Sequence, residues 1–164
     1  MKGWWQIGGV MMLAAAAPAL AADELEQLSD GYHTWAVEGT SDVRSCCFSW
    51  RNSKASGSGC KLDGSSVSVA TSGDCASGPG GAQVYVRVVN GATADVWVFS
   101  TNCPVASEDE IQDHGVVSAD RSVDWFRSQI ESRKVNQDVR EEALFALVQT
   151  ESDAAFRYLD GLLN

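Results

Sequence analysis

The sequence has few basic residues, little histidine and little proline. Its 164 residues include 12 Lys and Arg against 22 Asp and Glu, with two His and three Pro. The resulting net charge of −10 repels phosphate backbones and anionic lipid, so nucleic acid and membrane surfaces are poor partners. No segment matches a catalytic or cofactor-binding motif. We therefore expect a protein that is not an enzyme and that carries no cofactor.

Long apolar runs are confined to the first 22 residues. Lys2 provides a positive start, an apolar stretch follows, and Pro18 precedes the small-x-small pattern Ala19-Leu20-Ala21. This order predicts a secretory signal peptide over residues 1–21, because the apolar run is too short to span a bilayer. We expect the mature chain to be periplasmic or secreted, with no membrane contact after removal of the signal. It then has 11 basic and 22 acidic residues.

Residues 22–105 have the alternation that is typical of β-strands. Residues 31–38 alternate between two faces, and Val84, Val86 and Val88 share one face of another run. Asn90-Gly91 lies between that run and a run carrying Trp97 and Phe99, and these two residues tolerate the positive φ angles of a tight reversal. The pattern predicts a β-hairpin with a four-residue turn, residues 90–93.

Residues 106–164 change to the spacing of amphipathic helices. Ser118 or Asp120 is a candidate cap for a first helix, and Asp138 with Glu141 resembles a capping box that opens a second helix ending near Gln149. A third helix follows. The fold class that results is α+β: a disulfide-stapled antiparallel β domain at 22–105 that holds a core of its own, followed by a conditionally stable helical region at 106–164.

Residues 138–163 resemble one HEAT-like repeat of exported bacterial proteins whose function is uncharacterised. The segment DVREEALFALVQTESDAAFRYLDGLL has the form V-R-x-x-A-L-x-x-L, a polar turn, and a second helix that ends in Leu pairs. SCCFSW, CKLDG, NCPV and SVDWF give a weaker likeness to the N-terminal part of such proteins. The resemblance implies a protein-contact scaffold with no catalytic residues. The family pattern places these residues on the two helices: Val139, Arg140, Ala143, Leu144 and Leu147, then Leu159, Leu162 and Leu163.

All five cysteines, Cys46, Cys47, Cys60, Cys75 and Cys103, lie in the β region. In an exported chain such a set indicates a disulfide framework, and two bridges leave one free thiol. They can be drawn in 15 ways, five choices of free cysteine times three pairings. Adjacent strand residues face opposite sides, so Cys46 and Cys47 should have different partners. We favour Cys46 with Cys103 and Cys47 with Cys60, which leaves Cys75 free.

Three more specific chemical roles remain open for these cysteines. A vicinal Cys46–Cys47 redox bridge, a metal site of Cys46, Cys47 and His33, and a cysteine nucleophile with His33 or His114 as its base are the alternatives. Four tryptophans could line a ligand groove, although regular elements more often bury such residues in a core.

We expect the protein to act through contact with an unknown protein partner, or by self-association. The stripe formed by Phe156, Leu159 and Leu163 is the candidate contact surface unless the β region covers it, because monomers seldom leave such a patch open. The alternative function is a thiol-based redox or metal-binding protein centred on Cys46 and Cys47.

Overall fold

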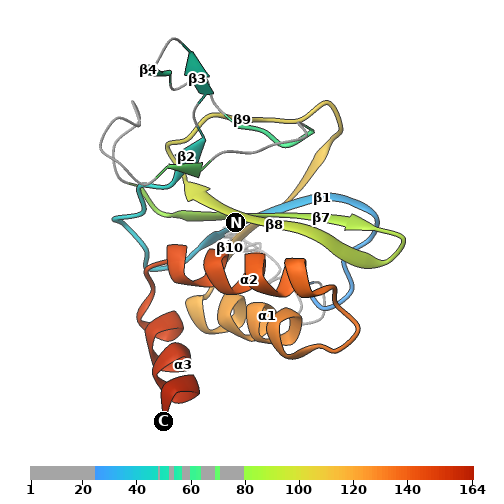
Figure 1. The fold of residues 1–164 in the computed structure, drawn as a ribbon, viewed down its shortest axis with the longest axis vertical. Coiled ribbons are helices and arrows are strands. Elements are labelled where there is room, and N and C mark those ends of the chain that lie inside the picture. Colours follow the sequence, from blue (N-terminus) through green and yellow to red (C-terminus); the bar gives the residue numbers. More distant parts are fainter. Residues whose placement is uncertain (1–24, 48, 52–53, 57–59, 64–68, 71–79) are drawn as a thin grey trace, which may run out of the picture.

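The computed structural model describes residues 25–47, 49–51, 54–56, 60–63, 69–70 and 80–164, and its centre is a four-stranded sheet (Figure 1). In spatial order the strands are β10 (Ile111–Val117), β1 (Gly31–Val37), β7 (Ala82–Val89) and β8 (Ala92–Ser100). Three helices follow the last strand: α1 (Ala119–Glu131), α2 (Gln137–Gln149) and α3 (Asp153–Leu163). The expected signal peptide, residues 1–21, lies outside the described residues.

Short strands form a second layer on the side of the sheet opposite α1 and α2 (Figure 1). They pair two by two, β2 with β6, β3 with β4, and β5 with β9. Their bounds are Cys46–Cys47 for β2, Ser49–Arg51 for β3, Lys54–Ser56 for β4, Cys60–Lys61 for β5, Val69–Ala70 for β6 and Val105–Ala106 for β9.

The α+β class is confirmed, but the sheet is mixed and not antiparallel. β1 is antiparallel to β7 on one side and parallel to β10 on the other, with Thr34 opposite Asp113. β10 falls in the region that was expected to be helical. Its apolar residues do not alternate, because the strand is interrupted near Gly115, which has a φ of 70° beside a register shift. A strand of this kind has little local signature.

The predicted β-hairpin is present, with a shorter turn than expected. β7 ends at Val89 and β8 begins at Ala92, so the turn has two residues and the expected four-residue turn is wrong. Asn90 and Gly91 have φ angles of 54° and 71°, which match the twist of the flanking strands. The pairing between the two strands shifts by one residue near the turn: Arg87 faces Asp95, whereas the next residue, Val88, faces Thr93.

The sheet and the helices bury one shared core. The helix side of the sheet carries buried residues of β1, β7 and β8, and α1 and α2 cover it, while α3 joins the same core through its contacts with α1 and α2. Trp35 of β1 meets Trp125 of α1 edge to face at a centroid separation of 5.1 Å. Its indole N–H also donates to Ser122 Oγ at 3.1 Å. The proposed boundary at residue 105 therefore does not separate the helices from the core of the sheet. Buried members of this core include Val84, Val86, Val98, Phe126, Ala143 and Leu147.

Side-chain caps begin each helix. Ser118, one of the two expected caps of α1, accepts from the Arg121 amide, and Ser152 accepts from the Ala155 amide of α3. For α2 the expected cap is wrong: Asn136 accepts from the amide of Asp138, so Asp138 lies in the first turn. Within the described part of the chain, no helix has the length and apolarity to cross a bilayer.

Candidate functional site

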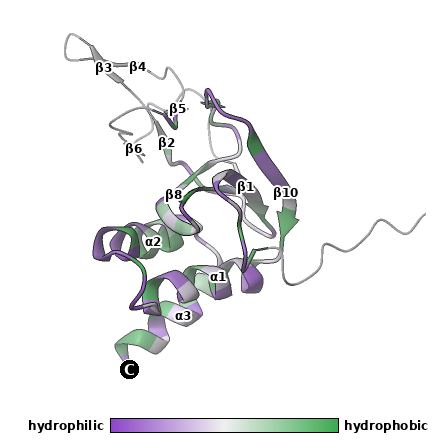
Figure 2. Ribbon diagram, turned by 90° about the vertical axis from the view of Figure 1, so that its right-hand side faces the viewer, coloured by the Kyte–Doolittle hydropathy of each residue, from purple (hydrophilic) through white to green (hydrophobic). Residues whose placement is uncertain are grey.

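The outer faces of α2 and α3 carry large apolar side chains that the described chain leaves partly or largely exposed. On α2, Phe145 is 57% exposed, and on α3, Phe156 is 54% and Leu163 is 87% exposed. The C-terminal part of α3 extends away from the sheet, and its end is strongly hydrophobic (Figure 2). We call the full set the helical apolar surface: Leu144, Phe145, Val148, Phe156, Leu162 and Leu163.

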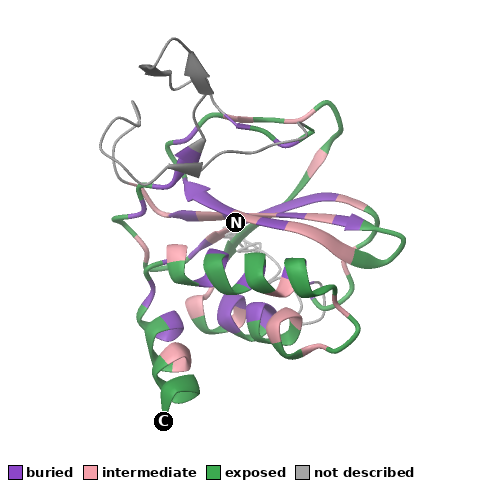
Figure 3. Ribbon diagram, viewed as in Figure 1, coloured by how far each residue is buried: buried purple, intermediate pink, exposed green. Residues whose placement is uncertain are grey.

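On α2 this exposure follows from the way the helix is seated. Val139, Ala143 and Leu147, at spacings of four, form the buried side of the helix, which packs on β8. Leu144 and Val148 are 36% and 40% exposed. Figure 3 shows that much of the outer side of α2 is exposed. The small Ala143 and Ala146 let the helix approach the sheet closely, and Ala146 was missed because one alanine gives little periodic signal.

The three residues predicted to form the contact surface on α3 differ in exposure. Phe156 and Leu163 are exposed, whereas Leu159 is partly buried and packs against the shared core. α3 is held from its other side by polar contacts to α1. Arg157 forms an ion pair with Asp120 at 3.1 Å, and the Tyr158 hydroxyl donates to Glu131 at 3.3 Å. The helix is thus fixed on α1 while most of its apolar stripe stays open.

Acidic side chains outnumber basic ones on the two helices that carry the helical apolar surface. Residues 137–164 contain six carboxylates and two arginines. One of these carboxylates, Glu142, reaches the sheet and accepts from the Val96 amide at 3.4 Å. Burial raises the pKa of Glu142, and the nearby charges of Asp95 and Asp138 act in the same direction. The six carboxylates belong to Asp138, Glu141, Glu142, Glu151, Asp153 and Asp160.

The cysteines lie on the opposite side of the sheet. Cys46 and Cys103 form the predicted bridge, and both pack with Phe99 and Tyr32 in a small second core. Because Cys46 is bonded to Cys103, a vicinal Cys46–Cys47 bridge is not formed. Cys60 lies in the same core and is also disulfide-bonded. Cys75 and the side chain of Cys47 lie outside the described residues, and with them the expected Cys47–Cys60 pair and free thiol.

The two histidines meet each other and not the cysteines. His33 is buried, and its Nε2 lies 2.8 Å from the Ser29 carbonyl, so this nitrogen carries the proton that it donates. Its Nδ1 then accepts from Nε2 of His114 at 3.1 Å. This geometry makes the pair a structural link. His114 is partly buried in this link. The proposed metal set of Cys46, Cys47 and His33 is not assembled, because Cys46 is oxidised and His33 shares the face of Trp35.

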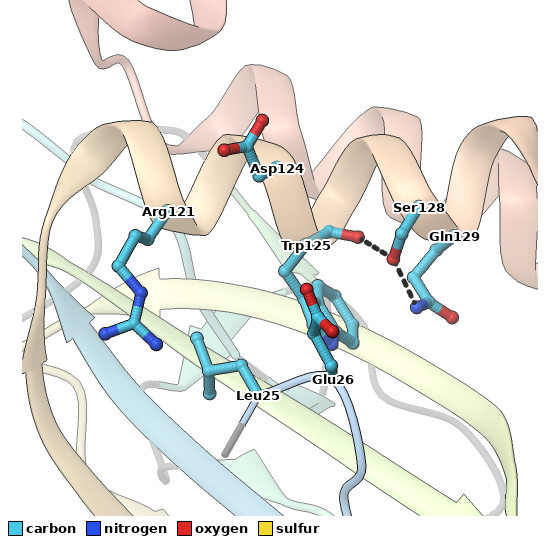
Figure 4. A pocket seen from close by; sticks show the side chains of 7 residues that line it. All are labelled: Leu25, Glu26, Arg121, Asp124, Trp125, Ser128 and Gln129. Atoms are coloured by element: carbon cyan, nitrogen blue, oxygen red, sulfur yellow. Dashed lines mark hydrogen bonds between the residues drawn. The ribbon is translucent and has the colours of Figure 1, made fainter. Parts of the chain in front are cut away.

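A surface pocket of about 420 Å³ lies between the N-terminal segment and α1 (Figure 4). Leu25 and Trp125 form its apolar wall, and three of its polar side chains are engaged along α1 itself. Ser128 donates to the Trp125 carbonyl at 2.6 Å and accepts from Gln129 at 3.0 Å. Asp124 forms an ion pair with Arg127. Trp35 and Trp125 are members of the shared core.

Metal-binding clusters of three or more His, Cys, Asp or Glu side chains do not occur among the described residues. The helical apolar surface is therefore the feature of the described chain that most clearly needs a functional explanation. No protein-family model matches the chain, and no curated protein sequence or solved structure shows detectable similarity to it.

Proposed function

We propose that this protein is an exported, non-catalytic binding protein that contacts another protein through the helical apolar surface. The observation that carries the proposal is the exposure of six large apolar side chains within residues 144–163. Leaving such residues in water is unfavourable, since burial of one Leu or Phe side chain contributes about 1.5–3 kcal/mol. A partner that covers even part of the set gains enough free energy for specific binding.

The charges near this surface define the partner further. The apolar residues share their segment with six carboxylates and only two arginines, so a complementary partner has an apolar patch with a basic rim. A second copy of the chain would bring two acidic rims together. Hetero-association is therefore favoured over self-association. The alternative function, redox or metal chemistry centred on Cys46 and Cys47, has less support because Cys46 is buried and bonded to Cys103 and not to Cys47.

Site-specific photo-crosslinking in cells that export the chain tests the proposal. A photoreactive amino acid at position 145, 156 or 163 should give one adduct of defined mass, and higher salt should reduce its yield. The same amino acid in place of Gln112, exposed on β10, is the matched control and should give no adduct. Absence of any adduct at all three positions contradicts the proposal. An adduct of twice the chain mass identifies self-association and contradicts the basic-rimmed partner.

A further inference from the structure

Three cysteine sulfurs meet in the second core. Cys46 is bonded to Cys103, and the Sγ of Cys60 lies 3.8 Å from the Sγ of Cys103. The backbone holds Cys60 in this place independently of its sulfur, because its amide donates to the Pro104 carbonyl at 2.9 Å and Leu62 donates to Ala106. All three cysteines are buried. Cys103 therefore has two cysteine neighbours, and only one of them can be bonded to it at a time.

We propose that Cys103 is a shared partner and that its disulfide exchanges between Cys46 and Cys60, giving the chain two native pairings. The step begins when a dithiol reductant opens the bond that Cys60 makes, and the reductant is itself oxidised to a disulfide. The Cys60 thiolate then attacks Sγ of Cys103. The Cys60–Cys103 bond forms, the Cys46–Cys103 bond breaks, and Cys46 leaves with the electron pair and takes a proton from water. The second step exchanges bonds without net oxidation.

The exchange has a structural consequence that reaches the helices. The bridge from Cys46 to Cys103 fastens the chain around Ser45, whose carbonyl accepts from the Ser100 amide at 2.7 Å. The Ser45 hydroxyl in turn donates to Gln149 at the end of α2. A bond between Cys60 and Cys103 joins two segments that are already hydrogen-bonded neighbours. It therefore does not hold the Ser45 segment at the end of β8. Exchange therefore releases the Ser45 segment from the end of β8 and loosens its contact with α2.

The variant Cys46→Ser tests the exchange without added reductant. In this variant the thiolate of Cys103 can attack Cys60 directly, and the earlier partner of Cys60 leaves as a thiolate. Peptide mapping of the natively purified, acid-quenched protein should then find Cys60 bonded to Cys103. Random pairing of four cysteines gives this bond in about one third of molecules, and the same variant reoxidised in denaturant supplies that reference. A free Cys103 together with an unchanged Cys60 bond overturns the proposal.

Graded reduction of the wild-type protein is the second test, and it holds even if the variant does not fold. Dithiothreitol is added in steps at pH 8.5, where more thiolate is present, and thiols are trapped by alkylation before mapping. The expected intermediate has a labelled Cys46 and a Cys60–Cys103 bond, and amide exchange at Ser100 increases with its amount. If Cys46–Cys103 persists in every partly reduced species, the proposal is wrong. Cys103→Ser is the control, since it removes the shared sulfur and should leave the Cys60 bond unchanged.

Discussion

Trp35 and Ser122, which lie 87 positions apart in the chain, share a hydrogen bond of 3.1 Å inside the core. Both residues are almost completely buried, so no water replaces the hydroxyl if it is lost. The bond joins β1 of the sheet to α1. It is a buried polar link between the two layers.

The substitution Ser122→Ala leaves the indole N–H of Trp35 without a partner in a buried place. We expect a loss of about 1–3 kcal/mol in the free energy of unfolding, measured by urea denaturation. Ser128→Ala on the same helix is the control, because Ser128 bonds only to groups of its own helix, and it should have a much smaller effect. Equal effects of the two substitutions would show that the bond to Trp35 contributes nothing particular.

A chain that ends at Val117 should lose its cooperative unfolding transition. Without α1 and α2, the helix side of the sheet exposes Trp35, Val84 and Val86, and the sheet cannot bury that area by itself. Circular dichroism during heating measures the transition. A chain that ends at Glu151 loses α3 and should keep the transition, since only Ala154 and Ala155 of α3 are fully buried, with Tyr158 and Leu159 partly buried beside them. A cooperative transition in the chain that ends at Val117 would show that the β region folds as an independent domain.

Two leucines of α3 should respond differently to a charge. Leu159→Glu places a carboxylate against the shared core, and we expect it to lower stability by about 1–3 kcal/mol. Leu163→Glu changes a residue that is 87% exposed and should alter stability by less than about 0.5 kcal/mol. Thermal unfolding distinguishes them. Leu163→Glu should nevertheless reduce crosslinking from position 156, which separates a contact role from a structural one.

Glu142 should make stability depend on pH. Its pKa is raised in the folded protein, so the folded state holds the proton more tightly than the unfolded state does. Stability from this group is present at low pH and decreases as pH rises from about the ordinary value of 4.5 through the raised pKa. Glu142→Gln remains neutral and still accepts from the Val96 amide. The variant should therefore be more stable than wild type at pH 7 and equal to it near pH 4.

The control for that experiment is Glu141→Gln, which removes the same charge from the exposed side of α2. It corrects for the general relief of acidic repulsion in a chain of net charge −10. If both variants gain the same stability at pH 7, burial of Glu142 is not the cause.

The sequence predicted those features whose signal is local. The Asn90-Gly91 reversal, the buried alternation of Val84, Val86 and Val88, and the Ser118 cap all depend on neighbouring residues, and all are present. The favoured bridge from Cys46 to Cys103 is present as well.

Features that depend on distant residues were missed. β10 becomes a strand because β1 offers it an edge, and nothing within residues 111–117 shows this. Leu144 fits the apolar pattern of the HEAT-like repeat, yet α2 rests on the sheet through Val139, Ala143 and Leu147 and leaves Leu144 outside. Periodicity shows which residues are apolar, whereas the partner of a helix decides which of them are covered. The meeting of His33 with His114 was missed for the same reason.

The parallel pairing of β1 with β10 sets the order in which the chain can fold. Thr34 and Asp113 meet although they are 79 positions apart, and closing so long a segment is slow. The bridge shortens the path to about 22 residues, 12 from Thr34 to Cys46 and 10 from Cys103 to Asp113. The entropic cost of closure then decreases by about 1 kcal/mol. Oxidation before the last strand docks should thus accelerate completion of the sheet, and a chain kept reduced should spend longer with β1 lacking its outer neighbour.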